Sequence, residues 1–337
     1  MIRDAIELLV QRQDLSVDVA VQVMEEIMTG EATPAQIGAF LTALRIKGET
    51  AEEIAGMARV MRDKAHRVHY PQAVVDTCGT GGDASGSFNV STAAAFVAAA
   101  GGLKVAKHGN RAMSSQCGSA DVLEALGVKL ELSPDMVRRC LDEAGIGFMF
   151  APAFHPAMRF AAGPRREIGI RTVFNILGPL TNPAGATHQV LGVADGAMAA
   201  KMAYVLHHLG SSHALVVHGE DGLDELSVCA PTQVWELKGG TVHEYRVTPE
   251  ELGIATATRD SIKGGNAQEN AATLRSLLSG KAGALRDMVA LNAGAALVAG
   301  DKASDLRAGI AAALRLMDDG SALSRVDALV HASNSNV

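Results

Sequence analysis

Two polar, glycine-rich segments constrain this chain more than any other feature, and both fall within residues 76–126. In the first, Gly79, Gly81 and Gly82 follow an apolar, strand-like run and precede an apolar helix predicted over 93–100. Glycine lets the backbone turn tightly and approach a ligand, because no Cβ stands in the way. A strand, a glycine loop and a helix start in succession favour anion binding, because free N–H groups and the helix dipole converge there.

The second segment repeats this arrangement and adds positive charge. We predict a strand over 103–106, a basic loop over 107–111 and a helix that begins near Ser119. Each segment alone is explained equally well by tight turns and helix caps. Together, and with Lys107 and Arg111, they favour a ligand that carries phosphates at two ends.

Neither segment matches a standard nucleotide-binding motif. The P-loop pattern G-x-x-x-x-G-K-[ST] does not occur in the chain. The run from Gly79 also fails the pattern G-x-G-x-x-G, because Ala84 stands at the last glycine position. The two segments therefore indicate phosphate binding of another kind.

The sequences of these two segments resemble those of one enzyme family. GTGGD from Gly79, N-x-S-T from Asn89 and KHGNRAxSSxxGSADxLEALG from Lys107 are similar to the anthranilate phosphoribosyltransferases of tryptophan biosynthesis. The resemblance extends over nearly the whole chain. It implies an α/β protein in which a small all-helical N-terminal domain precedes a larger α/β domain with a mostly parallel central sheet, as in nucleoside phosphorylases and phosphoribosyltransferases.

The resemblance also implies a reaction and a set of site residues. The enzyme would transfer the 5-phosphoribosyl group of 5-phosphoribosyl 1-diphosphate, the donor, to the amine of anthranilate, the acceptor, and release diphosphate. Ser87 is the one departure we notice, since we expect threonine there, and it keeps a hydroxyl group. By resemblance the donor contacts Gly79, Gly82, Asp83, Ser87, Asn89, Val90, Ser91, Thr92, Lys107, His108, Gly109, Asn110, Arg111, Ala112, Met113, Ser114, Ser115 and Ser119.

Four arginines lie in the segment 155–183, which is otherwise rich in glycine and proline. A guanidinium can bind a carboxylate through two parallel hydrogen bonds, although surface charges on a helix would look the same in sequence. By resemblance Arg165 contacts the acceptor carboxylate, together with Asn110 and Gly79, and Arg166 is the neighbour with which it could be confused. We expect part of 165–185 to pack back on the helical domain.

An acidic segment, GEDGLDE, follows a strongly apolar strand predicted over 214–218. Loops at strand ends are where α/β proteins place their sites, and adjacent carboxylates suit Mg²⁺. From the residues alone, an acidic surface turn is the commoner explanation. By resemblance, Asp224, Glu225 and the Ser91 hydroxyl hold magnesium.

The helical signals at the N-terminus set the predicted domains. Thr33 before Pro34, and Thr50 with Glu53, are typical helix starts. We predict a helical domain over 1–66, a linker, and an α/β domain over 72–337 that includes a hairpin over 234–247 and a helical region to 329. The tail from 331 is expected to fray. The apolar helix stripes and the resemblance predict a homodimer through the helical domain.

Charge and cysteine content exclude several classes of protein. The net charge of −7 does not favour nucleic-acid or membrane binding, so any phosphate site must be locally basic. The four cysteines lack C-x-x-C spacing, which argues against a zinc site or a disulfide framework. Asp4 and Glu7 make the N-terminus unlike a signal peptide, and no uncharged apolar run is long enough to span a bilayer. We expect a cytoplasmic protein.

Two other functions are compatible with a similar glycine loop. A pyrimidine nucleoside phosphorylase would need a phosphate nucleophile and a nucleobase pocket, and the long segment after Lys107 argues against it. A non-catalytic relative that binds nucleic acid would have a basic surface and would lack Asp224 and Glu225. No residue must act as a general base, so His108, His155 and the substrate's own carboxylate remain as proton acceptors.

Overall fold

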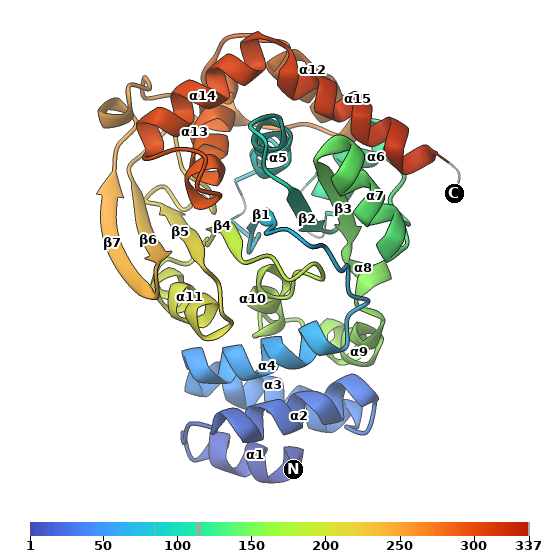
Figure 1. Ribbon diagram of the computed structural model, residues 1–337. Helices are drawn as coiled ribbons and strands as arrows, with labels where there is room; N and C mark the ends of the chain where they lie inside the picture. The colour runs from blue at the N-terminus through green and yellow to red at the C-terminus, as the bar shows by residue number, and fades with distance from the viewer. Residues whose placement is uncertain (84, 113–115, 336–337) are drawn as a thin grey trace.

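The N-terminal residues form four helices. The computed structural model describes residues 1–83, 85–112 and 116–335, and the first four helices of these ranges are α1 (Ile2–Val10), α2 (Val17–Thr29), α3 (Pro34–Lys47) and α4 (Ala51–Asp63). Capping boxes close the starts of α3 and α4, because Thr33 and Thr50 accept a backbone N–H while Gln36 and Glu53 reach back. These two starts are as predicted. The four helices form a separate layer below the rest of the molecule (Figure 1).

A seven-stranded sheet forms the centre of the described residues, in the order β3-β2-β1-β4-β5-β6-β7. The first five strands in this order are parallel, and β6 and β7 form an antiparallel hairpin at one edge. The prediction of a mostly parallel sheet is confirmed. The strands are β1 (Val75–Gly79), β2 (Val105–Gly109), β3 (Ile146–Phe150), β4 (His188–Gly192), β5 (His213–Gly219), β6 (Thr232–Lys238) and β7 (Thr241–Val247).

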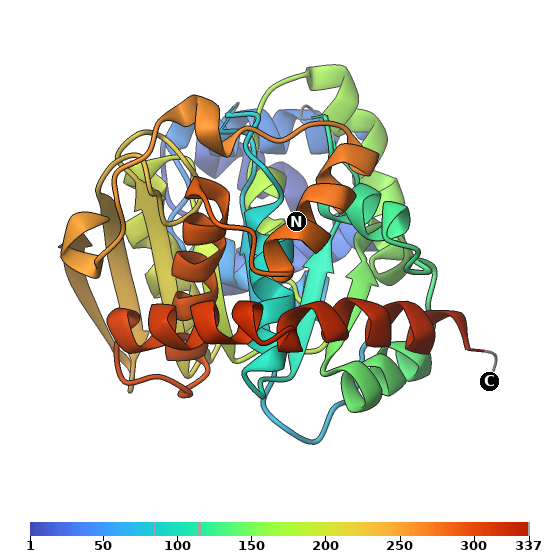
Figure 2. The same ribbon diagram turned by 90° about the horizontal axis from the view of Figure 1, so that it is seen from above.

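Helices cover both faces of this sheet. On one face α5 and α13 pack against β1 and β4, and α15 crosses above them, as Figure 2 shows. On the other face α11 packs against β5 and also contacts α4. The helices that follow β1 are α5 (Val90–Ala100), α6 (Ser119–Ala125), α7 (Pro134–Ala144), α8 (Ala151–Phe154), α9 (Arg159–Ile168), α10 (Phe174–Leu177), α11 (Gly196–His208), α12 (Ala267–Leu278), α13 (Ala284–Ala299), α14 (Leu306–Asp318) and α15 (Ser321–Asn334), with short 3₁₀ turns at Pro156–Met158, Gly178–Leu180, Glu250–Leu252 and Arg259–Ile262.

The sheet separates two hydrophobic cores. Successive side chains of a strand point to opposite faces. Val190 of β4 and Val217 of β5 accordingly join the core with α5 and α13, while Leu191 and Val216 join the core that includes the N-terminal helices. The N-terminal helices therefore share one continuous core with the lower face of the sheet.

The segment from α9 to the turn Gly178–Leu180 links the sheet to the N-terminal helices. Phe174 and Leu177 are almost completely buried in the lower core, and α9 contacts α2 and α3. Complete burial of a Leu or Phe side chain contributes roughly 1.5–3 kcal/mol. This segment carries Arg165 and is therefore anchored on both sides.

Two predicted boundaries are wrong. β2 runs from Val105 to Gly109, so Lys107, His108 and Gly109 are strand residues and not part of a loop. Pairing decides this, because Lys107 lies opposite Phe148 and Gly109 opposite Phe150 in β3. The C-terminal tail also stays helical to Asn334, whose side chain donates to the carbonyl of Gly127 at 2.8 Å.

No helix in the described ranges is long and apolar enough to cross a membrane.

Candidate active site

The strand order places a cleft at the carboxyl ends of β1 and β4. From β1 the chain passes to β2 and β3 on one side, and it then returns to β4 on the other side of β1. Ligands of open α/β sheets bind at such a switch point. The glycine loop after β1, the end of β2 and the acidic loop after β5 all lie at this edge, although they are far apart in the sequence.

Two glycines at these strand ends make room for the acidic loop. A Cβ on Gly79 would lie 2.2 Å from Asp224 Oδ2, and a Cβ on Gly192 would lie 1.4 Å from the carbonyl oxygen of Asp224. Any other residue at Gly192 would push the backbone of the loop away from the sheet, whereas a larger residue at Gly79 would displace the Asp224 side chain. Gly192 was not recognised from the sequence, because nothing in its local context marks it.

We expect Gly192→Ala to displace the acidic loop. Overpacking of this kind costs about 1–3 kcal/mol in the free energy of unfolding, and it should weaken Mg²⁺ binding as well. Denaturant unfolding and a Mg²⁺ titration measure the two effects. Gly163→Ala in α9 is the matched control, because its Cβ would meet no atom within 4 Å. A Gly192→Ala protein as stable as wild type would contradict this role for Gly192.

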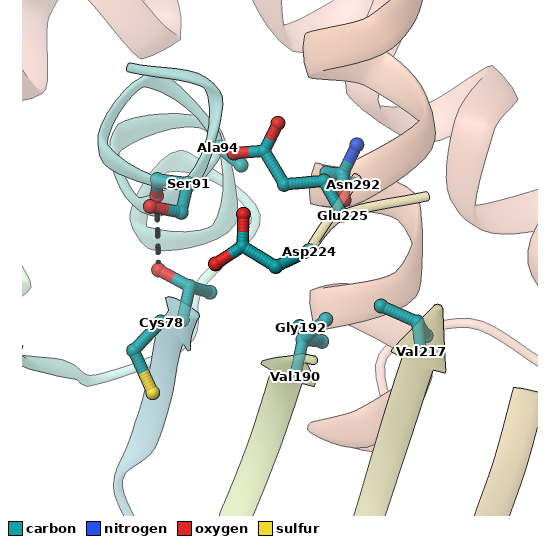
Figure 3. A pocket seen from close by; sticks show the side chains of 10 residues that line it. Cys78, Ser91, Ala94, Val190, Gly192, Val217, Asp224, Glu225 and Asn292 are labelled. Atoms are coloured by element: carbon teal, nitrogen blue, oxygen red, sulfur yellow. Dashed lines mark hydrogen bonds between the residues drawn. The ribbon is translucent and has the colours of Figure 1, made fainter. Parts of the chain in front are cut away.

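The acidic loop places two carboxylates beside α5. Figure 3 shows the side chains of Asp224 and Glu225 reaching towards the helix that carries Ser91 and Ala94. Burial and the charge of Asp83 raise the pKa of Asp224 to about 6. Burial, followed by the charges of Asp224 and Asp83, raises the pKa of Glu225 well above its usual value. Crowded, desolvated carboxylates of this kind are typical of cation sites.

The residues present fit a magnesium ion. Glu225 Oε2 and Asp83 Oδ2 are enclosed and make no hydrogen bond to any described residue. Mg²⁺ prefers oxygen ligands and usually takes one or two carboxylates from the protein, with substrate phosphates and water completing the shell. No three His, Cys, Asp or Glu side chains of the described residues form a metal cluster by themselves, so other oxygen ligands would have to complete the shell.

Asn292 of α13 holds the acidic loop in place. Its Oδ1 accepts the backbone N–H of Leu226 at 3.0 Å, and its Nδ2 donates to the carbonyl of Leu226 at 2.9 Å. Asn292 is almost completely buried, and it also bonds Met288 in its own helix. Sequence reasoning missed it, because a single Asn in an apolar helix carries no local signal.

The glycine loop after β1 is held by two groups from distant segments. The N–H of Gly81 donates to Asp224 Oδ2 at 2.7 Å. Arg171 donates to the carbonyls of Gly81 and Gly82, both at 3.2 Å. Gly81 and Gly82 have φ of 67° and 76°, which favours glycine at both positions.

The start of α5 connects the two predicted phosphate loops. Asn89 is the first residue before the helix, and its Nδ2 donates to the carbonyl of Cys117 beyond the second loop at 3.0 Å. Val90 and Thr92 are buried, whereas Ser91 is half-buried. The Thr92 hydroxyl is enclosed and has no hydrogen-bond partner among the described residues. Ser87, at the end of the first loop, makes an isolated bridge with Lys263.

The second loop is folded against α6 in this structure. Arg111 makes ion pairs with Asp121 at 3.0 Å and Glu124 at 2.8 Å, so its charge is already matched. Ala112 donates its N–H to Asp121, and Ser119 donates to the carbonyl of Asn110. Met113, Ser114 and Ser115 lie outside the described residues. Binding of the donor by this loop therefore stays a prediction.

Lys107 points beneath the site and not into the second loop. Its side chain is buried and donates to the carbonyl of Thr77 and, at 3.3 Å, to Ser91 Oγ. Burial lowers the pKa of Lys107, while the carboxylate of Asp76 opposes this shift. Asp76 in turn accepts Asn182 Nδ2 at 2.7 Å. This buried network places the amine of Lys107 behind Ser91.

His108 and His155 form a neutral pair below the sheet. Their rings lie 5.0 Å apart, and the Nε2 atom of each is enclosed without a partner among the described residues. Burial lowers the pKa of His108 to about 3 and that of His155 to about 4. Both rings are therefore uncharged at neutral pH.

Arg165 and Arg166 are adjacent in sequence but differ in their exposure to solvent. Arg165 is half-buried, its guanidinium lies 5.0 Å from the centre of the Phe174 ring, and burial lowers its pKa. Arg166 is exposed. An enclosed guanidinium over an aromatic ring is suited to a planar carboxylate, because stacking fixes the plane of its donors.

Comparison with known proteins shows to which family the chain belongs. Residues 3–65 match the glycosyl transferase family, helical bundle domain, and residues 71–323 match the glycosyl transferase family, a/b domain. The anthranilate phosphoribosyltransferase of Roseiflexus sp. (strain RS-1) is 60% identical over 334 residues, which cover 98% of each chain. The chain belongs to the anthranilate phosphoribosyltransferase family. The resemblance and the reaction class that it implies are thereby confirmed.

Solved structures of the family have the same fold. The crystal structure of anthranilate phosphoribosyltransferase from Thermus thermophilus has a TM-score of 0.94 at 47% identity, over 98% of this chain and 100% of that one. The enzyme from Saccharomyces cerevisiae, in complex with PRPP and Mg, has a TM-score of 0.90 at 28% identity, over 99% and 98%. The predicted helical N-terminal unit and larger α/β unit are those of the family.

Proposed function

We propose that the cleft at the ends of β1 and β4 binds 5-phosphoribosyl 1-diphosphate, Mg²⁺ and anthranilate, and catalyses phosphoribosyl transfer in tryptophan biosynthesis. This proposal rests on one observation: three parts of the chain lie together at the carboxyl ends of the parallel strands. These parts are the loop from Gly79 to Ser91, the second loop after Gly109, and the carboxylates of Asp224 and Glu225. The family to which the chain belongs performs this reaction.

The difficult step is cleavage of the bond between C1 of the ribose and the diphosphate oxygen. It builds positive charge on the ribose and negative charge on the leaving group. Mg²⁺ held by Asp224, Glu225 and Ser91 would neutralise the leaving diphosphate. Backbone N–H groups of the glycine loop add positive potential at the same place.

The acceptor amine needs positioning more than activation. An aromatic amine is mostly uncharged at neutral pH, so its placement against C1 can supply much of the acceleration. We infer that Arg165, with Asn110 and Gly79, fixes the acceptor through its carboxylate. A pKa of about 3 makes His108 a weak base. This favours the carboxylate of the acceptor over His108 as the group that takes the amine proton.

One assay tests the proposed function. The protein is mixed with anthranilate, the donor and Mg²⁺, and the loss of anthranilate fluorescence is followed. We expect loss that requires both the donor and the metal. A protein that leaves anthranilate unchanged but cleaves a pyrimidine nucleoside in phosphate would be a nucleoside phosphorylase instead.

We also propose a domain division at residues 66–72, a homodimer through the helical domain, a cytoplasmic location and no binding of nucleic acid. The dimer rests on the apolar helix stripes and on the family resemblance. Val10 and Ile46 are the two most exposed large apolar side chains of the helical domain, at 67% and 66%, so they are the positions at which we test it.

Sedimentation equilibrium should show a dimer at micromolar concentration. The double variant Val10→Lys with Ile46→Lys should sediment as a monomer, because charge at an apolar interface is costly. Tyr204→Lys is the matched control, since Tyr204 is 53% exposed on α11 and outside the helical domain. A monomeric wild type would overturn the proposed dimer.

A further inference from the structure

A second cavity lies on the other side of the glycine loop, between the end of α3 and the start of α11. Its volume is about 240 Å³, large enough for a small organic molecule. Thr80 and Gly82 of the glycine loop form one wall, and the segment after Arg171 forms another. Asp224, Glu225 and Arg165 do not line it, so it is distinct from the proposed metal and acceptor positions.

Four charged side chains converge on this cavity. Arg45 and Arg171 bring two positive charges, and Glu49 and Asp195 bring two negative charges. Within the described ranges, none of the four makes an ion pair, although the neighbouring Lys47 and Glu52 both do. The lining is therefore neutral overall, and its charges are unmatched.

Glu49 is the most unusual of the four. The residue is only 3% exposed, and its carboxylate makes no hydrogen bond to any described residue, while its backbone carbonyl accepts from Lys201. This carboxylate borders the cavity, and it is free to pair with a ligand that brings a positive charge.

Thr172 adds a second unmatched group. It is 5% exposed, and its Oγ1 is enclosed without a hydrogen-bond partner among the described residues. Its backbone N–H is already bonded to Asn175 Oδ1 at 2.9 Å. The hydroxyl is thus free to bond a polar group in the cavity. Ile176, Val193 and Met198 supply an apolar wall.

We propose that this cavity binds a free α-amino acid with an apolar side chain. The ammonium would pair with Glu49, the carboxylate would pair with Arg45 and Arg171, and the side chain would pack on Met198 and Ile176. A zwitterion is the ligand class that matches both guanidiniums and the Glu49 carboxylate at once, while Asp195 already accepts the backbone N–H of Ala197 at 3.0 Å. A simple anion would leave Glu49 unmatched, and a simple amine would leave the guanidiniums unmatched.

Arg171 connects this cavity to the donor loop. The guanidinium that would bind the ligand carboxylate also donates to the carbonyls of Gly81 and Gly82. A bound carboxylate competes for these donors. A ligand in the cavity therefore changes how firmly Arg171 holds the glycine loop, and the apparent Michaelis constant for the donor should change.

The test uses isothermal titration of the full-length protein with three matched probes. L-Phenylalanine carries both charges, phenethylamine lacks the carboxylate, and 3-phenylpropionate lacks the ammonium. We expect L-phenylalanine to bind at least about ten-fold more tightly than either analogue, since each loses one charge-assisted contact. Equal binding of 3-phenylpropionate, or no binding of L-phenylalanine at about 10 mM, would overturn the proposal.

Variants of the lining residues test whether the ligand binds in this cavity. Glu49→Gln should weaken L-phenylalanine binding by roughly ten-fold or more, and Arg45→Gln, on an exposed side chain, tests the same cavity without risk to the core. Glu52→Gln is the control, because Glu52 is 56% exposed on α4. Arg165→Ala should leave this binding unchanged. If Arg165→Ala abolished it, or if both Glu49→Gln and Arg45→Gln left it intact, the ligand would be in another site.

Discussion

The double variant Asp224→Asn with Glu225→Gln is expected to lose magnesium-dependent turnover by more than about a hundred-fold. A metal that neutralises a leaving diphosphate contributes several kcal/mol to the transition state, and each 1.36 kcal/mol corresponds to a factor of ten. Turnover is measured by anthranilate fluorescence over a range of Mg²⁺ concentrations. Wild-type turnover in the double variant would refute the metal assignment.

A second measurement separates loss of metal from loss of fold. The Asn and Gln side chains have nearly the same shape as the Asp and Glu side chains that they replace, so the acidic loop should keep its conformation. The substitutions remove two carboxylates whose pKa values are raised. The metal-free variant should therefore be at least as stable as wild type, and Mg²⁺ should raise the melting temperature of the wild type alone. A variant that melts much earlier than metal-free wild type would show that the carboxylates serve the fold.

The same carboxylates give a pH dependence with a definite sign. Because the pKa of Asp224 is raised to about 6, the folded protein takes up its proton before the unfolded chain does. This group therefore makes metal-free protein more stable as the pH falls from 7 towards 4. His108 and His155, whose pKa values are lowered, act in the opposite direction below about pH 6.5. Subtracting the variant's pH profile from that of wild type isolates the carboxylates.

Arg165→Ala is expected to raise the apparent Michaelis constant for anthranilate by about ten- to a hundred-fold. A carboxylate that leaves water needs a paired positive charge, and a charge-assisted contact of this kind contributes about 1.5–3 kcal/mol. Arg suits this role because its planar fork meets both oxygens, and Phe174 already holds the guanidinium plane. The constant for the donor should barely change, since the donor loops lie at the ends of β1 and β2.

Arg166→Ala is the matched control for this experiment. Arg166 is the next residue and has the same charge, but it is exposed. Its removal should leave both Michaelis constants within about two-fold of wild type. The assignment of Arg165 is wrong if Arg165→Ala weakens the donor instead, or if Arg166→Ala alone weakens the acceptor.

The sequence predicts a structural feature correctly where the residues that cause it lie within a few positions of one another. The starts of α3 and α4 follow from Thr33 and Thr50, because a cap and its partner are three residues apart. The end of β2 did not follow, because it depends on pairing with Phe148 and Phe150 across the sheet. The sequence alone therefore predicts Lys107 in a loop, whereas the structure buries it in β2 behind Ser91.

The family, the glycine-rich character of the two loops and the adjacent carboxylates of Asp224 and Glu225 follow from the sequence, because these are properties of contiguous residues. Only the tertiary structure decided which groups meet. It set Gly192 under Asp224, locked Leu226 with Asn292, and enclosed Arg165 while leaving Arg166 in solvent. Burial and charge proximity depend on distances between segments that lie far apart in the chain, because Leu226 and Asn292 are 66 residues apart and Gly81 and Asp224 are 143 apart, yet the Gly81 nitrogen lies 2.7 Å from Asp224 Oδ2.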